Sequence, residues 1–260
     1  MTMITPDGRG WRRLAILLVG IIILAPGCTS DVWLGDPEVP LAGERIAVNQ
    51  RNDTLEAASG VEPVVIPQAE VNRSWSQPGG NAANSPVHVA TNASLSRLWS
   101  ASVGAGSSSY GRLTSSPIVI GNALYSIDAT ARVTATSAGN GKQLWRVSLA
   151  PENEEAEGGF GGGIAADFGR IVVATGFGDV FGLDPASGQR LWSHSFGLPI
   201  RAAPTASDGR VYVITINNEV HSLDIETGEV IWDFRRYSES AGVLANTSAA
   251  VQDGKVVVPY

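Results

Sequence analysis

The chain has 260 residues, of which 43% are hydrophobic and 17% charged, and its formal net charge is −7. This length allows one large domain or two small ones. The acidic balance argues against binding to nucleic acid, whose phosphates require clustered Lys and Arg, and against docking on anionic lipid through a polybasic patch. The 30 glycines and the few charges favour many short strands joined by tight turns.

Residues 1–27 have the pattern of an export signal. Three arginines, at positions 9, 12 and 13, precede an apolar run of 11 residues from position 14 to 24. As a helix this run would reach roughly 16 Å, well short of the bilayer core of about 30 Å. A basic start followed by a short apolar segment therefore predicts a signal peptide.

Cys28 is the single cysteine of the chain and follows Ala25-Pro-Gly27 directly. This stretch resembles a bacterial lipobox, which implies a lipidated Cys28; an ordinary secretory signal and an uncleaved anchor are the alternatives. By the same resemblance, Thr29 rather than Asp after the cysteine implies the outer membrane. One cysteine excludes a disulfide within the chain and a Cys-based zinc site.

Residues 28–85 show no sustained hydrophobic period and are rich in Asp, Glu, Pro, Asn and Ala. We expect a lipidated tether and an entry segment here, with at most one short strand around residues 45–48.

A repeat occupies the rest of the chain. Trp99, Trp145, Trp192 and Trp232 are spaced by 46, 47 and 40 residues, a period typical of propeller blades or helical solenoids. Upstream of the last three tryptophans, a Gly four residues before and a Val twelve before recur, and Asp or Ser stands eight before.

The segments between these positions have the pattern of strands. β-Branched and aromatic runs follow turn signals, and two of the units carry an Asp-x-x-x-Gly hairpin turn before the tryptophan. The expected strands are 123–127, 171–175 and 211–215, then 133–136, 180–183 and 220–223, with an innermost strand before each first one, as at 202–205. No segment shows a helical period, so the solenoid is excluded.

These units predict an all-β fold, a β-propeller of four-stranded antiparallel blades in which each tryptophan packs between neighbouring blades. The propeller is expected over residues 86–260, with blades ending at Trp145, Trp192 and Trp232 and a partial blade at 246–260. Trp99 is expected to close a blade whose other strands lie elsewhere, so we expect a truncated chain.

The pattern Val-x-x-Leu-Asp-x-x-x-Gly-x-x-x-Trp resembles the PQQ-type propeller repeat, shared by quinoprotein dehydrogenases and by the BamB family of outer-membrane assembly lipoproteins. Pro40–Ile46 and Trp75–Gly80 resemble the N-terminal stretches of BamB-like proteins of alphaproteobacteria. Membership implies eight blades when complete, no cofactor and no enzymatic activity. It also implies a scaffold on the periplasmic face of the outer membrane that binds the POTRA domains of a BamA-type barrel protein.

Residues Leu198, Ile200 and Arg201 match the Leu-x-Leu-Arg pattern of that family's docking loop. The resemblance implies two exposed apolar anchors and a hydrogen-bonding arginine; the alternative is that Leu198 and Ile200 are core residues at a strand entry. The acidic pair that the family carries in its next inter-blade loop is not matched, because Leu244-Ala-Asn246 stands there.

Two other functions remain open from the sequence. A quinoprotein enzyme would need PQQ and calcium, often with a disulfide of adjacent cysteines that this chain lacks, and the third possibility is a propeller lipoprotein that binds cell-wall or carbohydrate ligands. His88, His194 and His221 lack the spacing of a zinc site, so no metal ligand and no catalytic residue is expected. The run Gly158–Gly163 opens no helix, so we interpret it as an inter-blade loop rather than a nucleotide site.

Overall fold

The computed structural model describes residues 65–92, 94–109, 111–155, 158–235 and 247–259. All of them belong to one compact unit, Val64–Tyr260. The predicted signal, Cys28 and most of the predicted tether lie outside these ranges. Within them no helix is long and apolar enough to cross a membrane.

Short β-strands are the regular structure of the described residues. In chain order they are β1 (Ile118–Ile120), β2 (Ala123–Ile127), β3 (Arg132–Ser137), β4 (Gln143–Ser148), β5 (Gly162–Asp167), β6 (Arg170–Thr175), β7 (Asp179–Leu183), β8 (Arg190–Ser195), β9 (Thr205–Ser207), β10 (Arg210–Ile214), β11 (Glu219–Asp224), β12 (Val230–Arg235), β13 (Ala250–Gln252) and β14 (Lys255–Val257).

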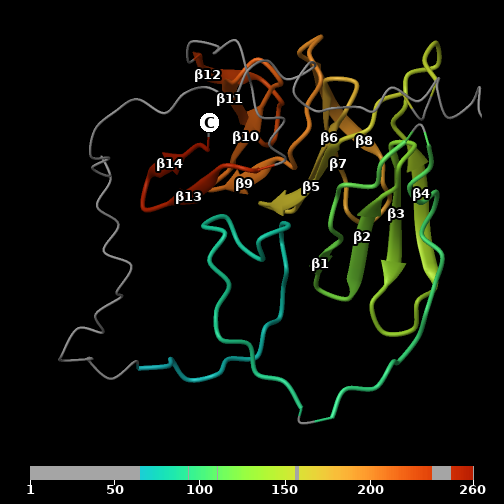
Figure 1. Ribbon diagram of the computed structural model, residues 1–260, viewed down its shortest axis with the longest axis vertical. Helices are drawn as coiled ribbons and strands as arrows, with labels where there is room; N and C mark the ends of the chain where they lie inside the picture. The colour runs from blue at the N-terminus through green and yellow to red at the C-terminus, as the bar shows by residue number, and fades with distance from the viewer. Residues whose placement is uncertain (1–64, 93, 110, 156–157, 236–246, 260) are drawn as a thin grey trace, which may run out of the picture. The chain divides into compact units, whose positions relative to one another are not determined.

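The strands form three four-stranded sheets and one two-stranded sheet, in which each strand pairs with its chain neighbour. We call β1–β4 blade 1, β5–β8 blade 2, β9–β12 blade 3 and β13–β14 the partial blade. Every pairing is antiparallel. Figure 1 shows the sheets side by side, with the first strand of each toward a common centre. The predicted fold class, an all-β propeller of four-stranded blades, is confirmed.

Two details of the expected strands are wrong. The innermost strand of blade 3 begins at Thr205 rather than at Ala202, with Pro204, which has no N–H to donate, just before it. Gly162 and Gly163 lie in β5, where they pair with Thr175 and Ala174 of β6, and not in the expected loop. Gly163 has space only for a hydrogen, because a Cβ there would lie 2.5 Å from the Ala203 side chain.

The Asp-x-x-x-Gly turns form as their residue types predict. Asp224 accepts hydrogen bonds on Oδ1 from the backbone N–H groups of Glu226 and Thr227, at 2.8 and 2.9 Å. The Gly228 N–H donates to the Asp224 carbonyl at 2.9 Å and closes the hairpin. Asp184 does the same for the turn of blade 2, which explains why both positions carry the same residue.

The repeat tryptophans lie at the seams between successive blades. The indole N–H of Trp145 donates to the Pro185 carbonyl at 2.9 Å, and that of Trp192 donates to the Ile225 carbonyl at 2.9 Å. Each acceptor belongs to the turn of the following blade. Beneath each ring is the glycine of that turn, where an added Cβ would lie 2.5 Å or less from the indole.

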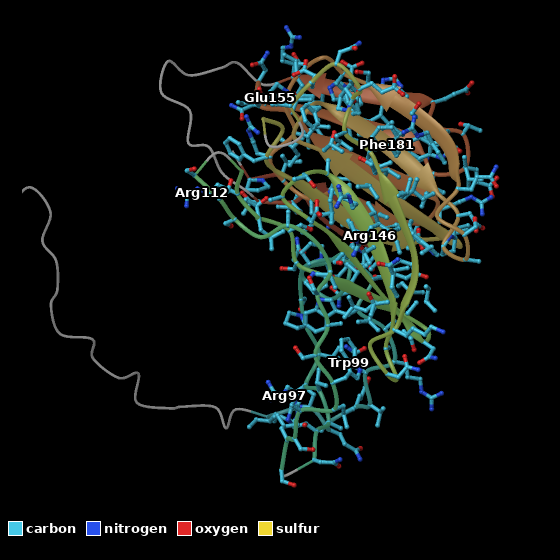
Figure 2. All side chains as sticks on the ribbon, turned by 90° about the vertical axis from the view of Figure 1, so that its right-hand side faces the viewer. Arg97, Trp99, Arg112, Arg146, Glu155 and Phe181 are labelled. Atoms are coloured by element: carbon cyan, nitrogen blue, oxygen red, sulfur yellow. The ribbon has the colours of Figure 1, made fainter. Side chains whose placement is uncertain are left out.

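Trp99 makes the same contact without a strand. Its indole N–H donates to the Ala138 carbonyl at 2.8 Å, and its ring covers Gly141 in the turn of blade 1. Figure 2 shows it on the irregular segment that precedes blade 1. The expected closing strand is not present at Trp99 in the described residues.

The core is divided among the seams. One apolar cluster joins blades 1 and 2 through residues such as Val133 and Ile164, and a second joins blades 2 and 3 through Val172 and Val211. A third cluster joins Tyr212 of blade 3 to the partial blade. Because each blade buries its faces against its neighbours, the stack of blades is the unit that provides a hydrophobic core.

Candidate docking site

The loop Gly197–Arg201 joins β8 to β9 and is held by blades 2 and 3. The Ile216 N–H of blade 3 donates to the Pro199 carbonyl at 3.0 Å, and Ile200 pairs with Thr215 in an isolated antiparallel bridge. On the other side, the Gly162 N–H of β5 donates to the Arg201 carbonyl at 3.3 Å. The backbone of the predicted docking loop is therefore anchored on both flanks.

Ile200 does not have the place that the family resemblance implies. Its side chain is 0% exposed and packs in the cluster that joins blades 2 and 3. The expectation of an exposed Ile200 is wrong, and the alternative, a core residue at a strand entry, describes it. The reason is the bridge to Thr215, which turns this position inward.

Leu198 and Arg201 are half-buried and reach the surface. The Leu198 backbone lies against Gly178, where a Cβ would lie 2.5 Å from the Leu198 carbonyl oxygen. Ile216, whose N–H is bonded to the same loop, is 38% exposed. Leu198 and Ile216 are thus partly exposed apolar side chains on anchored backbone.

Arg201 is positioned by Phe160, from the start of blade 2. The guanidinium carbon lies 4.1 Å from the centroid of the Phe160 ring, and Nη1 donates a hydrogen bond to the Phe160 carbonyl. Burial lowers the pKa of the Arg201 guanidinium from its ordinary value. Cation–π contact and the hydrogen bond together hold the charge beside an aromatic ring that is 36% exposed.

Sequence reasoning missed Phe160. It lies inside the run Gly158–Gly163, which the sequence suggests only as a loop. The sequence does contain a signal for Phe160: it is the single aromatic residue in a run of glycines, which allow another segment of backbone to approach closely. Gly161 allows that approach, since a Cβ there would lie 2.9 Å from the Ile200 carbonyl oxygen.

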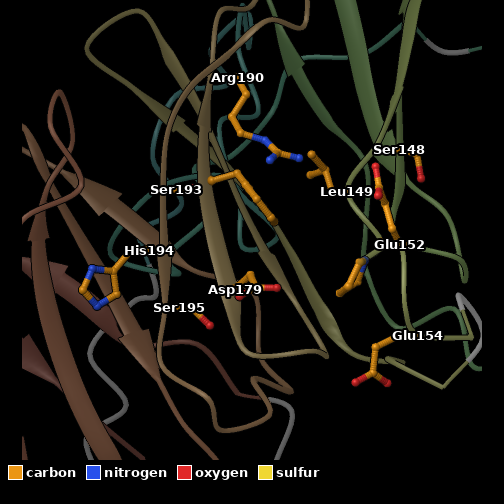
Figure 3. Close-up of a pocket in the computed structure, with 12 residues that line it drawn as sticks. Ser148, Leu149, Glu152, Glu154, Asp179, Arg190, Ser193, His194 and Ser195 are labelled. Carbon is orange, nitrogen blue, oxygen red and sulfur yellow. The ribbon is translucent and has the colours of Figure 1, made fainter.

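A recess lies between blades 1 and 2 (Figure 3). It has a volume of about 740 Å³ and is lined by the end of β4, the loop after it, β7 and β8. Three carboxylates, Glu152, Glu154 and Asp179, share it with Arg190, whose guanidinium lies 4.6 Å from the centroid of the Phe181 ring. These mixed charges converge on no single point, so the recess suggests no chemistry.

Two of the three histidines lie close together. His194 and His221 both contact the Phe196 ring, with centroids 4.5 and 4.3 Å from it. Burial lowers the pKa of His221, against the opposing effects of Glu219 and Asp233. In the part of the chain that the structure describes, no group of three or more His, Cys, Asp or Glu side chains could hold a metal ion.

Comparison with known proteins gives the family. The family model for outer membrane protein assembly factor BamB matches residues 129–260. The BamB of Burkholderia pseudomallei is 31% identical over 166 residues, which cover 62% of this chain and 40% of the relative. That of Nitrosomonas eutropha is 24% identical over 251 residues, which cover 96% of this chain and 51% of the relative. The chain therefore spans about half or less of these relatives.

Among solved structures, a quinohemoprotein alcohol dehydrogenase from Pseudomonas putida HK5 matches with a TM-score of 0.54 and 21% identity, covering 63% of this chain and 27% of that one. At this identity the likeness shows the fold alone. The family model covers half of the chain and includes the last two strands of blade 1 and all of blades 2 and 3. The chain therefore belongs to the family of outer membrane protein assembly factor BamB.

Proposed function

We propose that this chain works as a non-enzymatic scaffold of the outer-membrane protein assembly machinery. In this proposal it is anchored to the periplasmic face of the outer membrane by a lipid on Cys28. It docks on the periplasmic POTRA domains of a BamA-type barrel-inserting protein. The relatives described above are outer membrane protein assembly factors, which supports this function.

The observation that carries the docking part is the pairing of Arg201 with Phe160 beside Leu198. Arginine and aromatic side chains are enriched at the energetic centres of protein interfaces. Here the guanidinium is already held in place by the ring and by the Phe160 carbonyl. A side chain that is ordered before binding loses less conformational entropy on binding, so preorganisation favours affinity.

The hypothesis of a quinoprotein enzyme is supported only by the shared fold. No observation on the described residues favours it, and none favours a propeller that binds cell-wall or carbohydrate ligands.

A pull-down tests the docking site. The protein is recovered from detergent-solubilised membranes as wild type, Leu198→Ala and Arg201→Ala, beside controls Leu191→Ala and Arg210→Ala. The control residues are an exposed leucine and an exposed arginine on strands β8 and β10. Ile200 is left unchanged, because truncation of a fully buried isoleucine costs about 2–5 kcal/mol of stability.

We expect the wild type and both controls to recover a BamA-type barrel protein, and both site variants to lose most of it. Recovery by the site variants would refute the docking site and keep the scaffold function. If no sample, wild type included, recovers a barrel protein, the scaffold function itself is refuted.

The lipid anchor has a separate test. Cells are labelled with radioactive palmitate, and the wild type is compared with Cys28→Ala. We expect label on the wild type in the outer-membrane fraction, and an unlabelled variant that is released from the membrane, since acyl chains supply about 0.8 kcal/mol of membrane affinity per buried CH₂. An unlabelled wild type would refute lipidation.

A further inference from the structure

The segment Trp75–Asn84, part of the predicted entry segment, bonds to the innermost strand of every described sheet. Trp75 pairs with Val119 of blade 1 through two backbone hydrogen bonds of 2.8 and 2.9 Å. The Ala166 N–H of blade 2 donates to the Ser76 carbonyl at 2.8 Å. Adjacent residues of one segment therefore contact two different blades.

Gln77 extends the contact to blade 3 with its side chain. Its Nε2 donates to the Ala206 carbonyl at 3.0 Å, and its Oε1 accepts from the Ala206 N–H at 3.1 Å. The side chain is buried, at 3% exposure. The Gln77 amide thus satisfies the backbone N–H and carbonyl of Ala206, as a neighbouring strand would do at the edge of β9.

The end of the segment reaches the partial blade. The Val251 N–H donates to the Ala82 carbonyl at 2.7 Å, and Asn84 Nδ2 donates to the Ala249 carbonyl at 3.3 Å. The Ala82 side chain packs in the third apolar cluster, between blade 3 and the partial blade. One stretch of chain thus contacts the inner edges of four sheets.

The segment is itself a folded turn. The Gly80 N–H donates to the Gln77 carbonyl at 2.7 Å, and the Ser76 N–H donates to the Gly80 carbonyl at 3.2 Å. The indole N–H of Trp75 donates to the Pro78 carbonyl at 3.3 Å. These bonds give the segment one shape, so its contacts to the four sheets are geometrically linked.

Three of the four inner strands are short, so they gain from such a partner. β1, β9 and β13 have three residues each, so each forms few ladder bonds with the next strand of its own sheet. Backbone groups on the inner edge of a sheet that are buried without a partner cost free energy. The segment supplies partners at Val119, Ala166, Ala206 and Val251.

We infer that residues Trp75–Asn84 are an internal strap that ties together the inner strands of all four described sheets and occupies the central space that these strands face (Figure 1). A ligand that approaches the inner strands at these positions has to displace the strap. The inference is independent of the docking function, because it depends on contacts within the chain.

Hydrogen exchange of the full chain, measured by mass spectrometry, tests the strap. In Gln77→Leu both bonds to Ala206 are lost; in Gln77→Glu the acceptor remains and the donor is lost. Gln189→Leu, at an exposed glutamine in the turn before β8, is the control. The peptides to follow cover β5, β9 and β13, with β4 and β8 as outer-strand references.

For Gln77→Leu we expect exchange in β9 to rise by roughly tenfold or more, the equilibrium factor for loss of a buried hydrogen-bond pair, with a rise in β5 and β13 as well. Gln77→Glu should show a rise at least as large in the same peptides, because its buried carboxylate faces the Ala206 carbonyl oxygen with no proton to donate. The control should show none. A rise confined to residues 74–85 would overturn the inference. So would a uniform rise across inner and outer strands in both Gln77 variants.

Discussion

Trp192 and Trp232 hold the same position in successive repeats and have different surroundings. Trp192 is 9% exposed, donates to the Ile225 carbonyl and covers Gly228 in the turn of blade 3. Trp232 is half-buried and contacts the Tyr212 ring of its own blade at a centroid distance of 6.0 Å. Beside it, a recess of about 490 Å³ opens between Val220, Phe234 and Val256.

The difference teaches that the blade that follows a repeat tryptophan supplies the acceptor for its indole N–H and the glycine beneath its ring. The degree of burial varies among tryptophans with these partners, since Trp145 has both and is half-buried. Trp192 is covered because blade 3 presents a complete hairpin turn with a glycine under the ring. Next to Trp232 the described residues present only β13 and β14, which have no such turn. The hydrogen bond and the glycine contact of these tryptophans, and the stability that they contribute, therefore depend on a neighbouring repeat.

The sharpest test of this comparison removes each ring. We expect Trp192→Ala to lower the free energy of unfolding by about 3–5 kcal/mol, because it leaves a cavity at a closed seam. In the chain of 260 residues, Trp232→Ala should cost about 2 kcal/mol less, since its ring is already partly in water there. Urea unfolding of the two variants measures the difference. Equal losses would contradict the dependence on the following blade.

A pair of glycine substitutions isolates the contact beneath the ring. Gly228 and Gly209 have φ angles of +75° and +74°, so alanine is strained by a similar amount at both. A Cβ at Gly228 would lie 2.4 Å from the Trp192 ring, whereas Gly209 faces open space. We expect Gly228→Ala to lose about 1–3 kcal/mol more stability than Gly209→Ala in urea unfolding. Similar losses would mean that the ring can move away freely.

The indole hydrogen bond gives a smaller effect. Trp192→Phe keeps an aromatic ring and leaves the Ile225 carbonyl without its donor, so we expect a loss of about 1 kcal/mol beyond that of Trp232→Phe. Thermal unfolding of both variants measures it. A larger loss of stability for Trp232→Phe would contradict a stabilising hydrogen bond from the Trp192 indole to the Ile225 carbonyl.

The turn under Trp192 should respond to acid. Hydrogen bonds from the Thr227 and Glu226 backbones lower the pKa of Asp224 from the ordinary value of 3.8. Its folded pKa is therefore below its unfolded pKa. The charged form stabilises the fold above the unfolded pKa, and this stabilisation is lost as pH falls through the folded pKa.

We expect Asp224→Asn to show a shallower fall in melting temperature than the wild type between about pH 5 and pH 3. Glu226→Gln, at an exposed side chain of the same turn, is the control and should follow the wild type. An unchanged slope in Asp224→Asn would mean that the carboxylate does not stabilise the turn.

Much of the fold could be predicted from local chemistry. The predicted strand 211–215 differs from β10 by one residue at each end. The Asp-x-x-x-Gly turns form because the Asp side chain accepts hydrogen bonds from the backbone of the same turn. The site was only partly predictable. The pattern at 198–201 locates the loop, but the burial of Ile200 depends on a bridge to Thr215, which sequence spacing does not reveal.

By itself the sequence determined the strand period, the hairpin turns and the all-β class, because these depend on residues within a few positions of one another. The tertiary structure alone decided which side chains lie inside the fold. It paired Phe160 with Arg201 across 41 residues of chain and Gln77 with Ala206 across 129. These contacts form because the stacking of blades brings distant segments of the chain together. No local sequence pattern encodes which distant segments will meet.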